Sequence, residues 1–300
     1  CNNLDPSVKI ASPHRLHSQQ WGVMCPFESP DGSSIGYIKN FALMTTVTFG
    51  TDASYIKECL GDLGVHTITE VRYTQLKEDT LIYLNGQLYG THSNPRTFTD
   101  QFRCIRRNGL INIYTSISWN IQENAIRILT DPGRLCRPVL IVEQCNLCYL
   151  DERFEANSKG ERPWFDMIFG TLLPKAERNE ELYTKGYYIS PFDDARFPQF
   201  PRDPKKVFQA LARTQGCIDV LDIEEANTCM IAVFPKDIGV RHTHCEIHPS
   251  TIFSVVTNNI PFANHNQAPR NIFYGSQGKQ SIGVYASNYN QRFDKSAYVL

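Results

Sequence analysis

The sequence predicts an α+β, multi-domain fold in which mixed helices and antiparallel sheets are connected by long ordered loops. Apolar residues recur at helical spacing over 53–63, an Asn-Gly dipeptide separates two short apolar runs at 81–90, and 137–142 has the pattern of a buried strand. The chain has 300 residues, of which 41% are hydrophobic. This length is about twice that of a typical domain, so one large or two to three modest domains with real cores are expected.

The charge balance excludes several classes of protein. Lys and Arg number 30 against 31 Asp and Glu, which gives a formal net charge of -1. A free-standing module that holds nucleic acid by bulk electrostatics is therefore disfavoured, and any nucleic-acid role must be local. No apolar run approaches the length of a membrane span, so we expect a soluble protein with no membrane partner. Because the chain opens on Cys1 and not on Met, we expect a fragment.

The first half of the chain is predicted to contain a packed loop, a helix and a hairpin. Residues 13–40 are dense in Gly, Pro and Ser but also hold large apolar side chains, which indicates a loop packed against another part of the protein. A helix over 53–63 should stop at Gly64. Asn85-Gly86 tolerates the positive φ of a type I′ turn and therefore predicts a hairpin.

A second helix is predicted to begin at Asn94-Pro95 and to carry three arginines near its C-terminal end. These are Arg103, Arg106 and Arg107. Cations stabilise a helix C-terminus through the macrodipole, so we favour this structural role over a functional one. Two strands at 126–130 and 137–142, joined by a turn at 131–134, follow the helix.

The second half changes in character at residues 151–207, where charges of both signs are mixed with prolines and no long period survives. We interpret this segment as an irregular insertion. A helix is expected around Val207–Ala212, with Gly216 as its end, and the apolar run Thr228–Val233 has the length of a strand.

The ten cysteines are scattered along the chain, so free thiols in a reducing compartment are favoured over disulfides. Cys145 and Cys148 are the only close pair, and no second pair follows at the spacing of a zinc site. We therefore favour a structural or incidental role for this pair over metal binding.

The segment from Arg241 onward is rich in amides and histidines, and three chemical interpretations compete there. His244, Glu246 and His248 alternate and could bind a metal from one face of a strand, but a buried polar strand end is at least as natural. Ser250 beside His248 lacks the glycine frame of a hydrolase nucleophile. A phosphate-contacting surface is the third interpretation, although composition alone favours a generic loop.

Two long motifs resemble the second-largest, β-type subunit of multisubunit DNA-directed RNA polymerases, in its eukaryotic, archaeal or large-DNA-virus form. The first resembles the fork-region signature and comprises Arg15 or His14, His17, Trp21-Gly22, Cys25-Pro26, Glu28-Ser29-Pro30-Asp31-Gly32, Gly36 and Lys39-Asn40. The second resembles the hybrid-binding signature and comprises His244–Ser250, Ile260–Phe262, His265–Gln267, Pro269–Asn271, Gly278–Gln280, Gly283 and Asn288–Asn290. Ser29 and Asp31 depart mildly from the usual Thr and Glu.

The resemblance implies four regions within an internal portion of such a subunit. Residues 1–52 would form the fork region, 53–142 an external domain 1-like unit, 143–238 an external domain 2-like unit that contains the insertion at 151–207, and 239–300 the start of the hybrid-binding domain. The insertion is longer than the usual nuclear pattern, which is typical of a divergent eukaryotic or viral enzyme.

The resemblance also implies nucleotidyl transfer in template-directed RNA synthesis, with activity only inside the multisubunit complex. Arg270 is the expected catalytic residue, near the triphosphate of the incoming nucleotide. The residues expected to line the nucleotide and the RNA–DNA hybrid are His265, Asn266, Gln267, Asn271, Lys279 and Gln280. Those expected beside downstream DNA are Arg15, His17, Glu28, Asp31 and Lys39.

Cofactors, partners and location are likewise implied by the family. Mg²⁺ would be held mainly by aspartates of the largest subunit, zinc is expected only beyond this fragment, and no metal site is expected in this chain. The partners would be the largest and other polymerase subunits, template DNA, nascent RNA and ribonucleoside triphosphates. The nucleus is the expected location, with a virion or host cytoplasm as the viral alternative. The alternative function is that of a polymerase-derived structural or interaction protein without catalysis.

Overall fold

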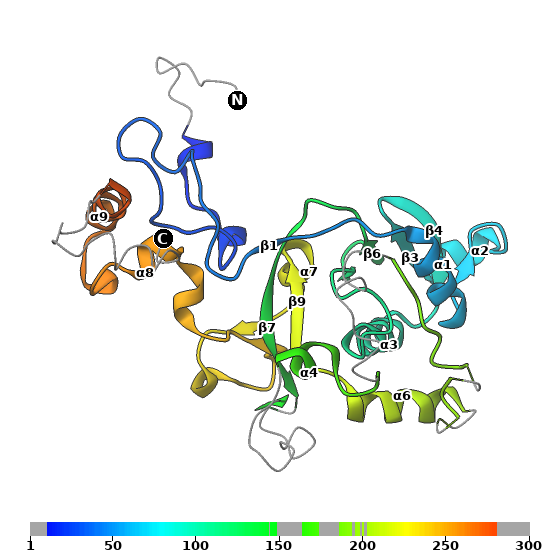
Figure 1. The fold of residues 1–300 in the computed structure, drawn as a ribbon. Coiled ribbons are helices and arrows are strands. Elements are labelled where there is room, and N and C mark those ends of the chain that lie inside the picture. The colour runs from blue at the N-terminus through cyan, green and yellow to red at the C-terminus, as the bar shows by residue number, and fades with distance from the viewer. Residues whose placement is uncertain are drawn as a thin grey trace, which may run out of the picture.

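The computed structural model describes residues 11–143, 145–148, 164–173, 186–193, 196–198, 200 and 203–280. These residues form two sheets with helices around them and a separate lobe of loops and short helices (Figure 1). The predicted α+β class is confirmed. About half of the insertion at 151–207 lies outside the described residues, as do Gly283 and Asn288–Asn290, so their roles stay predictions.

One sheet has five strands, in the order β2 (His66–Thr67), β4 (Gln87–His92), β3 (Thr80–Leu84), β6 (Ala125–Leu129) and β5 (Ser116–Asn120). The predicted hairpin is β3 and β4, and its turn residues Asn85 and Gly86 have φ of 49° and 80°. β3 pairs in parallel with β6. The helix over Pro95–Arg107 and β5 separate β4 from β6 in the chain and return it to the end of the sheet where β3 begins.

Three helices share the core of this sheet: α1 (Ala53–Asp62), α3 (Pro95–Arg107) and α6 (Pro204–Thr214). The short α2 (Tyr73–Glu78) has no buried residue, and α4 (Trp164–Phe169) packs Met167 and Ile168 against the core of the other sheet. Phe98, Phe102 and Ile105 repeat along one face of α3 and are fully buried in a cluster that includes Ile82 and Ile126. Each such side chain contributes roughly 1.5–3 kcal/mol by leaving water. The helices predicted near 53–63, 94–107 and 207–212 are therefore confirmed.

The second sheet is built around the long strand β7 (Leu135–Glu143), which is apolar and buried along most of its length. The strands that pair with β7 are β1 (Thr46–Val47), β8 (Asn146–Leu147), β9 (Ile218–Asp222) and β11 (His244–Cys245). β10 (Ile231–Ala232) pairs in parallel with β11. The strand predicted over Thr228–Val233 is thus much shorter, because α7 (Ile223–Asn227) and its Thr228 cap occupy the preceding residues.

The turn at 131–134 connects strands that do not pair with each other. β6 belongs to the five-stranded sheet and β7 to the other, so the turn carries the chain between the two sheets. Gly133 has a φ of 82° there, a conformation that side-chain-bearing residues adopt at a cost. The two strands predicted from the sequence are confirmed, and the turn is a link between sheets.

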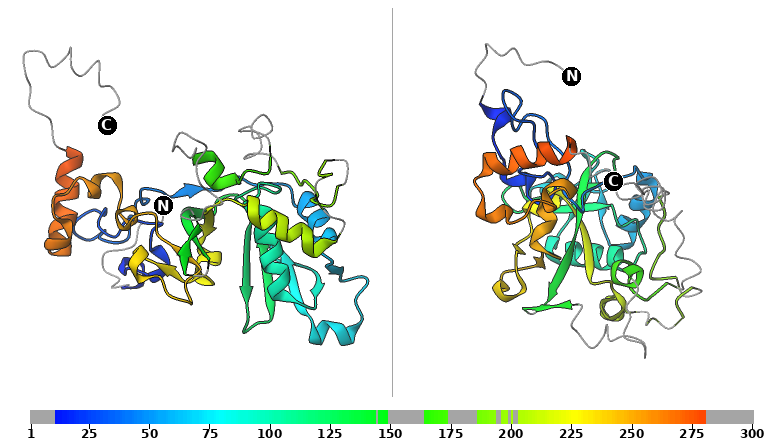
Figure 2. Two further views of the ribbon diagram at one scale, coloured as in Figure 1. Left: turned by 90° about the horizontal axis from the view of Figure 1, so that it is seen from below. Right: turned by 60° about the vertical axis from the view of Figure 1, so that its left-hand side comes forward.

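The terminal lobe, defined here as residues 11–45 and 249–280, lies beyond one side of the β7 sheet in all three views (Figures 1 and 2). Its longest helix is α9 (Ala268–Gln280), which follows the short α8 (Val255–Asn258). The lobe's 3₁₀ turns are Ser12–His14, Ser18–Gln20, Pro249–Ile252 and Ala263–His265, and a further one at Pro235–Asp237 precedes β11.

Contacts between its two segments, which are more than 200 residues apart in the chain, hold the lobe together. The Leu43 amide donates to the Phe253 carbonyl at 2.9 Å, and the rings of Phe27 and Phe253 stack 5.4 Å apart. The buried Cys25 thiol lies 3.2 Å from the Thr257 hydroxyl. The prediction that 13–40 is a packed loop is confirmed. Among the described residues, no helix combines the length and apolar character that crossing a membrane requires.

Candidate functional site

An ion pair between Glu28 and Lys279 connects the two segments of the terminal lobe. Lys279 Nζ lies 2.7 Å from Glu28 Oε1, and the Glu28 side chain is only 10% exposed. The loop around Glu28 is fixed by its own backbone, since the Glu28 amide donates to Cys25 Sγ at 3.3 Å and its carbonyl accepts from Asn40 Nδ2 at 2.9 Å. Glu28, predicted beside DNA, faces α9 in this structure, where its carboxylate pairs with Lys279.

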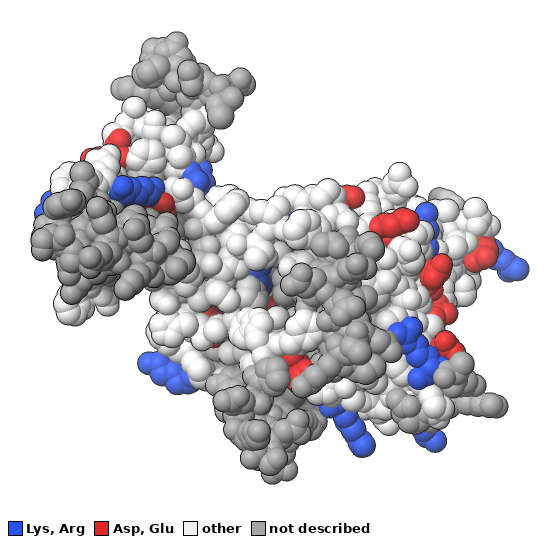
Figure 3. Space-filling model, viewed as in Figure 1, with Lys and Arg blue, Asp and Glu red and all other residues white. Residues whose placement is uncertain are grey.

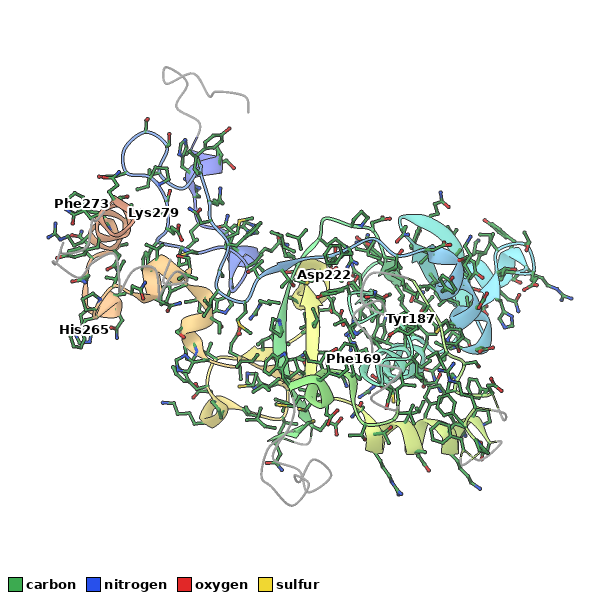
Figure 4. All side chains as sticks on the ribbon, viewed as in Figure 1. Phe169, Tyr187, Asp222, His265, Phe273 and Lys279 are labelled. Carbon is green, nitrogen blue, oxygen red and sulfur yellow. The ribbon has the colours of Figure 1, made fainter. Side chains whose placement is uncertain are left out.

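Arg270 lies on the exposed surface of α9 and is held by aromatic rings. Its guanidinium carbon lies 4.4 Å from the centroid of Tyr274 and 5.1 Å from that of Phe273, and Nη2 donates to the Tyr274 hydroxyl at 3.1 Å. Among the residues that the structure describes, no carboxylate lies within ion-pair distance of Arg270. Its positive charge is therefore available to an anion. Figure 4 shows Phe273, Lys279 and His265 within the same lobe.

The other residues predicted in this segment divide between surface and interior. His265, Gln267 and Gln280 are exposed, and Asn266 is half-buried. Asn271, by contrast, is fully buried, and its Nδ2 donates to the Ala263 carbonyl at 2.7 Å. The Asn271 side chain thus ties α9 to the turn at Ala263–His265 and is turned away from the surface.

The other predicted fork residues lie in the first segment of the lobe, on the loops around Glu28. Arg15 and Asp31 are exposed, and Asp31 Oδ1 accepts from the Gly32 amide at 2.9 Å. His17 is also exposed but caps the turn at Ser18–Gln20, where Nδ1 accepts from the Gln19 amide at 3.2 Å. Lys39 Nζ donates to the Pro13 carbonyl at 3.2 Å, which closes the loop between them.

A buried charge network, which was not predicted from the sequence, joins α3 to the β7 sheet. Arg106 is 1% exposed and donates to Asp219 at 2.9 Å and to both carboxylate oxygens of Glu225 at 2.7 and 2.9 Å. Arg107 donates to Asp219 at 2.7 Å, and Arg103 to Glu225 at 3.4 Å. The arginines therefore cross-link two units of the fold, beyond any effect on the helix dipole. The sequence signal for this network was the pair of acids, Asp219 and Asp222, on the short strand at 218–222.

The electrostatics of this network follow from burial and charge pairing. Burial alone would raise the pKa of Asp219, but Arg106 and Arg107 outweigh it and hold the pKa well below the usual carboxyl range. His244 Nε2 lies 3.4 Å from Asp219, and burial lowers the pKa of His244 although Asp219 favours its protonated form. Burial therefore favours the neutral form of His244.

The alternating His244, Glu246 and His248 have separate partners. His244 contacts Asp219, Glu246 accepts from Trp21 Nε1 at 3.1 Å and pairs with Arg137, and His248 lies on the exposed turn that it caps. Among the described residues, no group of three His, Cys, Asp or Glu side chains could hold a metal ion. His248 Nδ1 lies 2.6 Å from Ser250 Oγ, but it also accepts from the Ser250 amide, as expected for a local cap.

The carboxylates of the described residues do not fit a magnesium site either. Among the described residues, each buried acid pairs with a basic side chain. The nine cysteines at positions 25–245 are free thiols; Cys145 is exposed and Cys148 buried.

Positive and negative side chains are interspersed on the face seen in Figure 3, in keeping with the net charge of -1.

Comparison with known proteins gives matches to three domains of one polymerase subunit. Residues 3–47 match RNA polymerase Rpb2, domain 3, residues 82–143 match domain 4, and residues 256–300 match domain 6. These matches follow the chain in the order of the domain numbers.

Individual relatives match over nearly the whole chain. The DNA-directed RNA polymerase II subunit RPB2 of Encephalitozoon cuniculi is 31% identical over 99% of the chain, and the polymerase III subunit RPC2 of Saccharomyces cerevisiae is 34% identical over 100%. The polymerase subunit Rpo2 of Sulfolobus acidocaldarius is 31% identical over 95%. The chain covers only 23%, 22% and 22% of these relatives, so it corresponds to less than a quarter of their length.

Proposed function

Because the chain belongs to the family of second-largest DNA-directed RNA polymerase subunits, as an internal segment of them, we propose that it forms part of the nucleotide-addition centre of a multisubunit polymerase. The observation that carries the proposal is the guanidinium of Arg270, which is exposed on α9 and has no carboxylate partner among the described residues. Such a cation offsets the charge that develops on the pyrophosphate leaving group.

Other residues of the terminal lobe would contact the sugar–phosphate backbone of the nucleic acid. His265, Asn266, Gln267, Lys279 and Gln280 lie at least partly at the surface and would face the incoming nucleotide and the RNA–DNA hybrid. Their amides and cations suit phosphate and sugar oxygens, while base pairing supplies the sequence specificity. Asn271 acts from the interior, where it fixes the start of α9.

The first segment of the lobe, residues 11–45, would face downstream DNA. Arg15 and Lys39 supply cations, and His17 and Asp31 shape the loops that carry them. Glu28 holds Lys279 in place through their ion pair. We keep the division into regions 1–52, 53–142, 143–238 and 239–300 as part of this proposal; the ranges 3–47 and 256–300 lie within the first and last of these regions, and 82–143 falls in the second apart from its final residue.

Magnesium and the remaining partners belong to other chains in this proposal. Since the described carboxylates do not fit Mg²⁺, its ligands would lie mainly on the largest subunit, and zinc would bind outside this segment. The other polymerase subunits, template DNA, nascent RNA and ribonucleoside triphosphates are the proposed partners. The eukaryotic relatives favour the nucleus, and none of the relatives given above supports a viral source.

The experiment is single-nucleotide addition by the assembled polymerase that contains Arg270→Ala. A hydrogen bond to a charged group contributes about 1.5–3 kcal/mol. Its loss should lower the ratio of the maximal rate constant to the half-saturating nucleotide concentration by roughly 10- to 100-fold. Arg213→Ala is the control, because Arg213 is an exposed arginine on α6, outside the lobe. Unchanged kinetics with Arg270→Ala would remove the catalytic role and favour a structural function for the chain.

A further inference from the structure

Three side chains on one face of α9 form a cation–aromatic cluster. Arg270, Phe273 and Tyr274 stand at positions i, i+3 and i+4, so they are neighbours on the helix surface. The guanidinium lies over the Tyr274 ring at 4.4 Å and donates to its hydroxyl at 3.1 Å, while Phe273 is 5.1 Å away. Both rings are more than a third exposed, so the cluster faces solvent.

An aromatic ring holds an arginine without cancelling its charge. The ring's quadrupole attracts the guanidinium, but no counter-charge has to be displaced when an anion arrives. Lys279, on the same helix, shows the opposite arrangement, because Glu28 neutralises it at 2.7 Å. A long arginine side chain that is already ordered also loses less conformational freedom when it binds a ligand.

We propose that Tyr274 is a positioning residue for Arg270, which holds the guanidinium ordered and fully charged for the triphosphate of the incoming nucleotide. The proposal rests on the function proposed above for Arg270. The Tyr274 ring lies against the guanidinium, and its hydroxyl accepts one hydrogen bond that fixes the orientation of the guanidinium.

The test uses single-nucleotide addition by the assembled polymerase with Tyr274→Leu and Tyr274→Phe. A cation–π contact at an exposed site predicts a rise of about two- to five-fold in the half-saturating nucleotide concentration for Tyr274→Leu, with a smaller change in maximal rate. Tyr274→Phe keeps the ring and should retain most of the wild-type affinity. Tyr73→Leu is the matched control, because it removes an exposed tyrosine whose ring lies 5.0 Å from Lys77 on α2, and it should change nothing.

The same substitutions in an Arg270→Ala background separate this inference from the proposed function. If Tyr274 acts through Arg270, Tyr274→Leu has no further effect once the arginine is absent. The positioning role would be overturned if Tyr274→Leu still raised the half-saturating nucleotide concentration in the Arg270→Ala background. It would also be overturned if Tyr274→Leu left that concentration unchanged, or lowered it, in the wild-type background. If Arg270→Ala itself leaves the kinetics unchanged, the proposed function fails, and the inference fails with it.

Discussion

The buried network around Arg106 predicts a large and specific loss of stability when that residue is replaced. In Arg106→Met the long apolar side chain keeps much of the volume, but three hydrogen bonds to Asp219 and Glu225 and one to the Thr115 carbonyl disappear. Removing one partner of a buried pair leaves an uncompensated charge, at a cost of about 3–5 kcal/mol. Most of this cost arises at the buried Glu225. Once Arg106 is replaced, Arg103 at 3.4 Å is the remaining ion-pair partner of Glu225 among the described residues.

The assay is urea unfolding of the 300-residue chain, with the free energy obtained by linear extrapolation. Arg127→Met is the matched control: Arg127 also bridges two carboxylates, Glu123 and Glu224, but its side chain is 44% exposed. Surface pairs contribute about 0–1 kcal/mol, so the control should lose no more than that. Equal losses for the two variants would refute the argument that burial gives the Arg106 network its strength.

Three further predictions concern the lobe and the network. A double-mutant cycle of Glu28→Ala and Lys279→Ala in urea unfolding should give a coupling of about 0.2–1 kcal/mol, because the lysine is half-exposed; zero coupling would show that the pair does not stabilise the lobe. Burial lowers the pKa of His244, so as pH falls from 7 to 5 the unfolded chain binds the proton first and stability decreases. His244→Gln should make the decrease of unfolding free energy with falling pH shallower, and an identical pH dependence would contradict the lowered pKa of His244. Gly36→Ala should cost about 1–3 kcal/mol, since Gly36 has a φ of 70° and its Cβ would lie 2.2 Å from a carbonyl oxygen. Gly64→Ala, with a φ of 77° and open space around its Cβ, should cost less in the same measurement.

Local sequence signals predicted the elements that depend on local physics. The Asn85-Gly86 turn, the cap and proline at the start of α3 and the apolar period of α1 each act within a few residues, and each is found in the structure. The separation of β6 and β7 into different sheets could not be predicted this way, because pairing depends on strands such as β9 that are distant in the sequence.

The candidate site was predicted in its residues but not in its contacts. The two motifs were identified separately, and only the fold brings Glu28 to Lys279 across 250 intervening residues. For Arg106 the prediction from sequence was incomplete. Its position suited a helix C-terminus, but its partners, Asp219 and Glu225, lie more than 100 residues away in the chain. Burial of Asn271 likewise depends on packing that its polar neighbours did not indicate.

The central claim is that the terminal lobe faces the incoming nucleotide, and photo-crosslinking tests it most directly. A ribonucleoside triphosphate with an aryl azide on its γ-phosphate would be bound by the assembled, stalled polymerase, irradiated and mapped by tryptic digestion. We expect label on the peptides 242–270 and 271–279, which meet at Arg270. Label confined to the five-stranded sheet and its helices, with none on these two peptides, would contradict it.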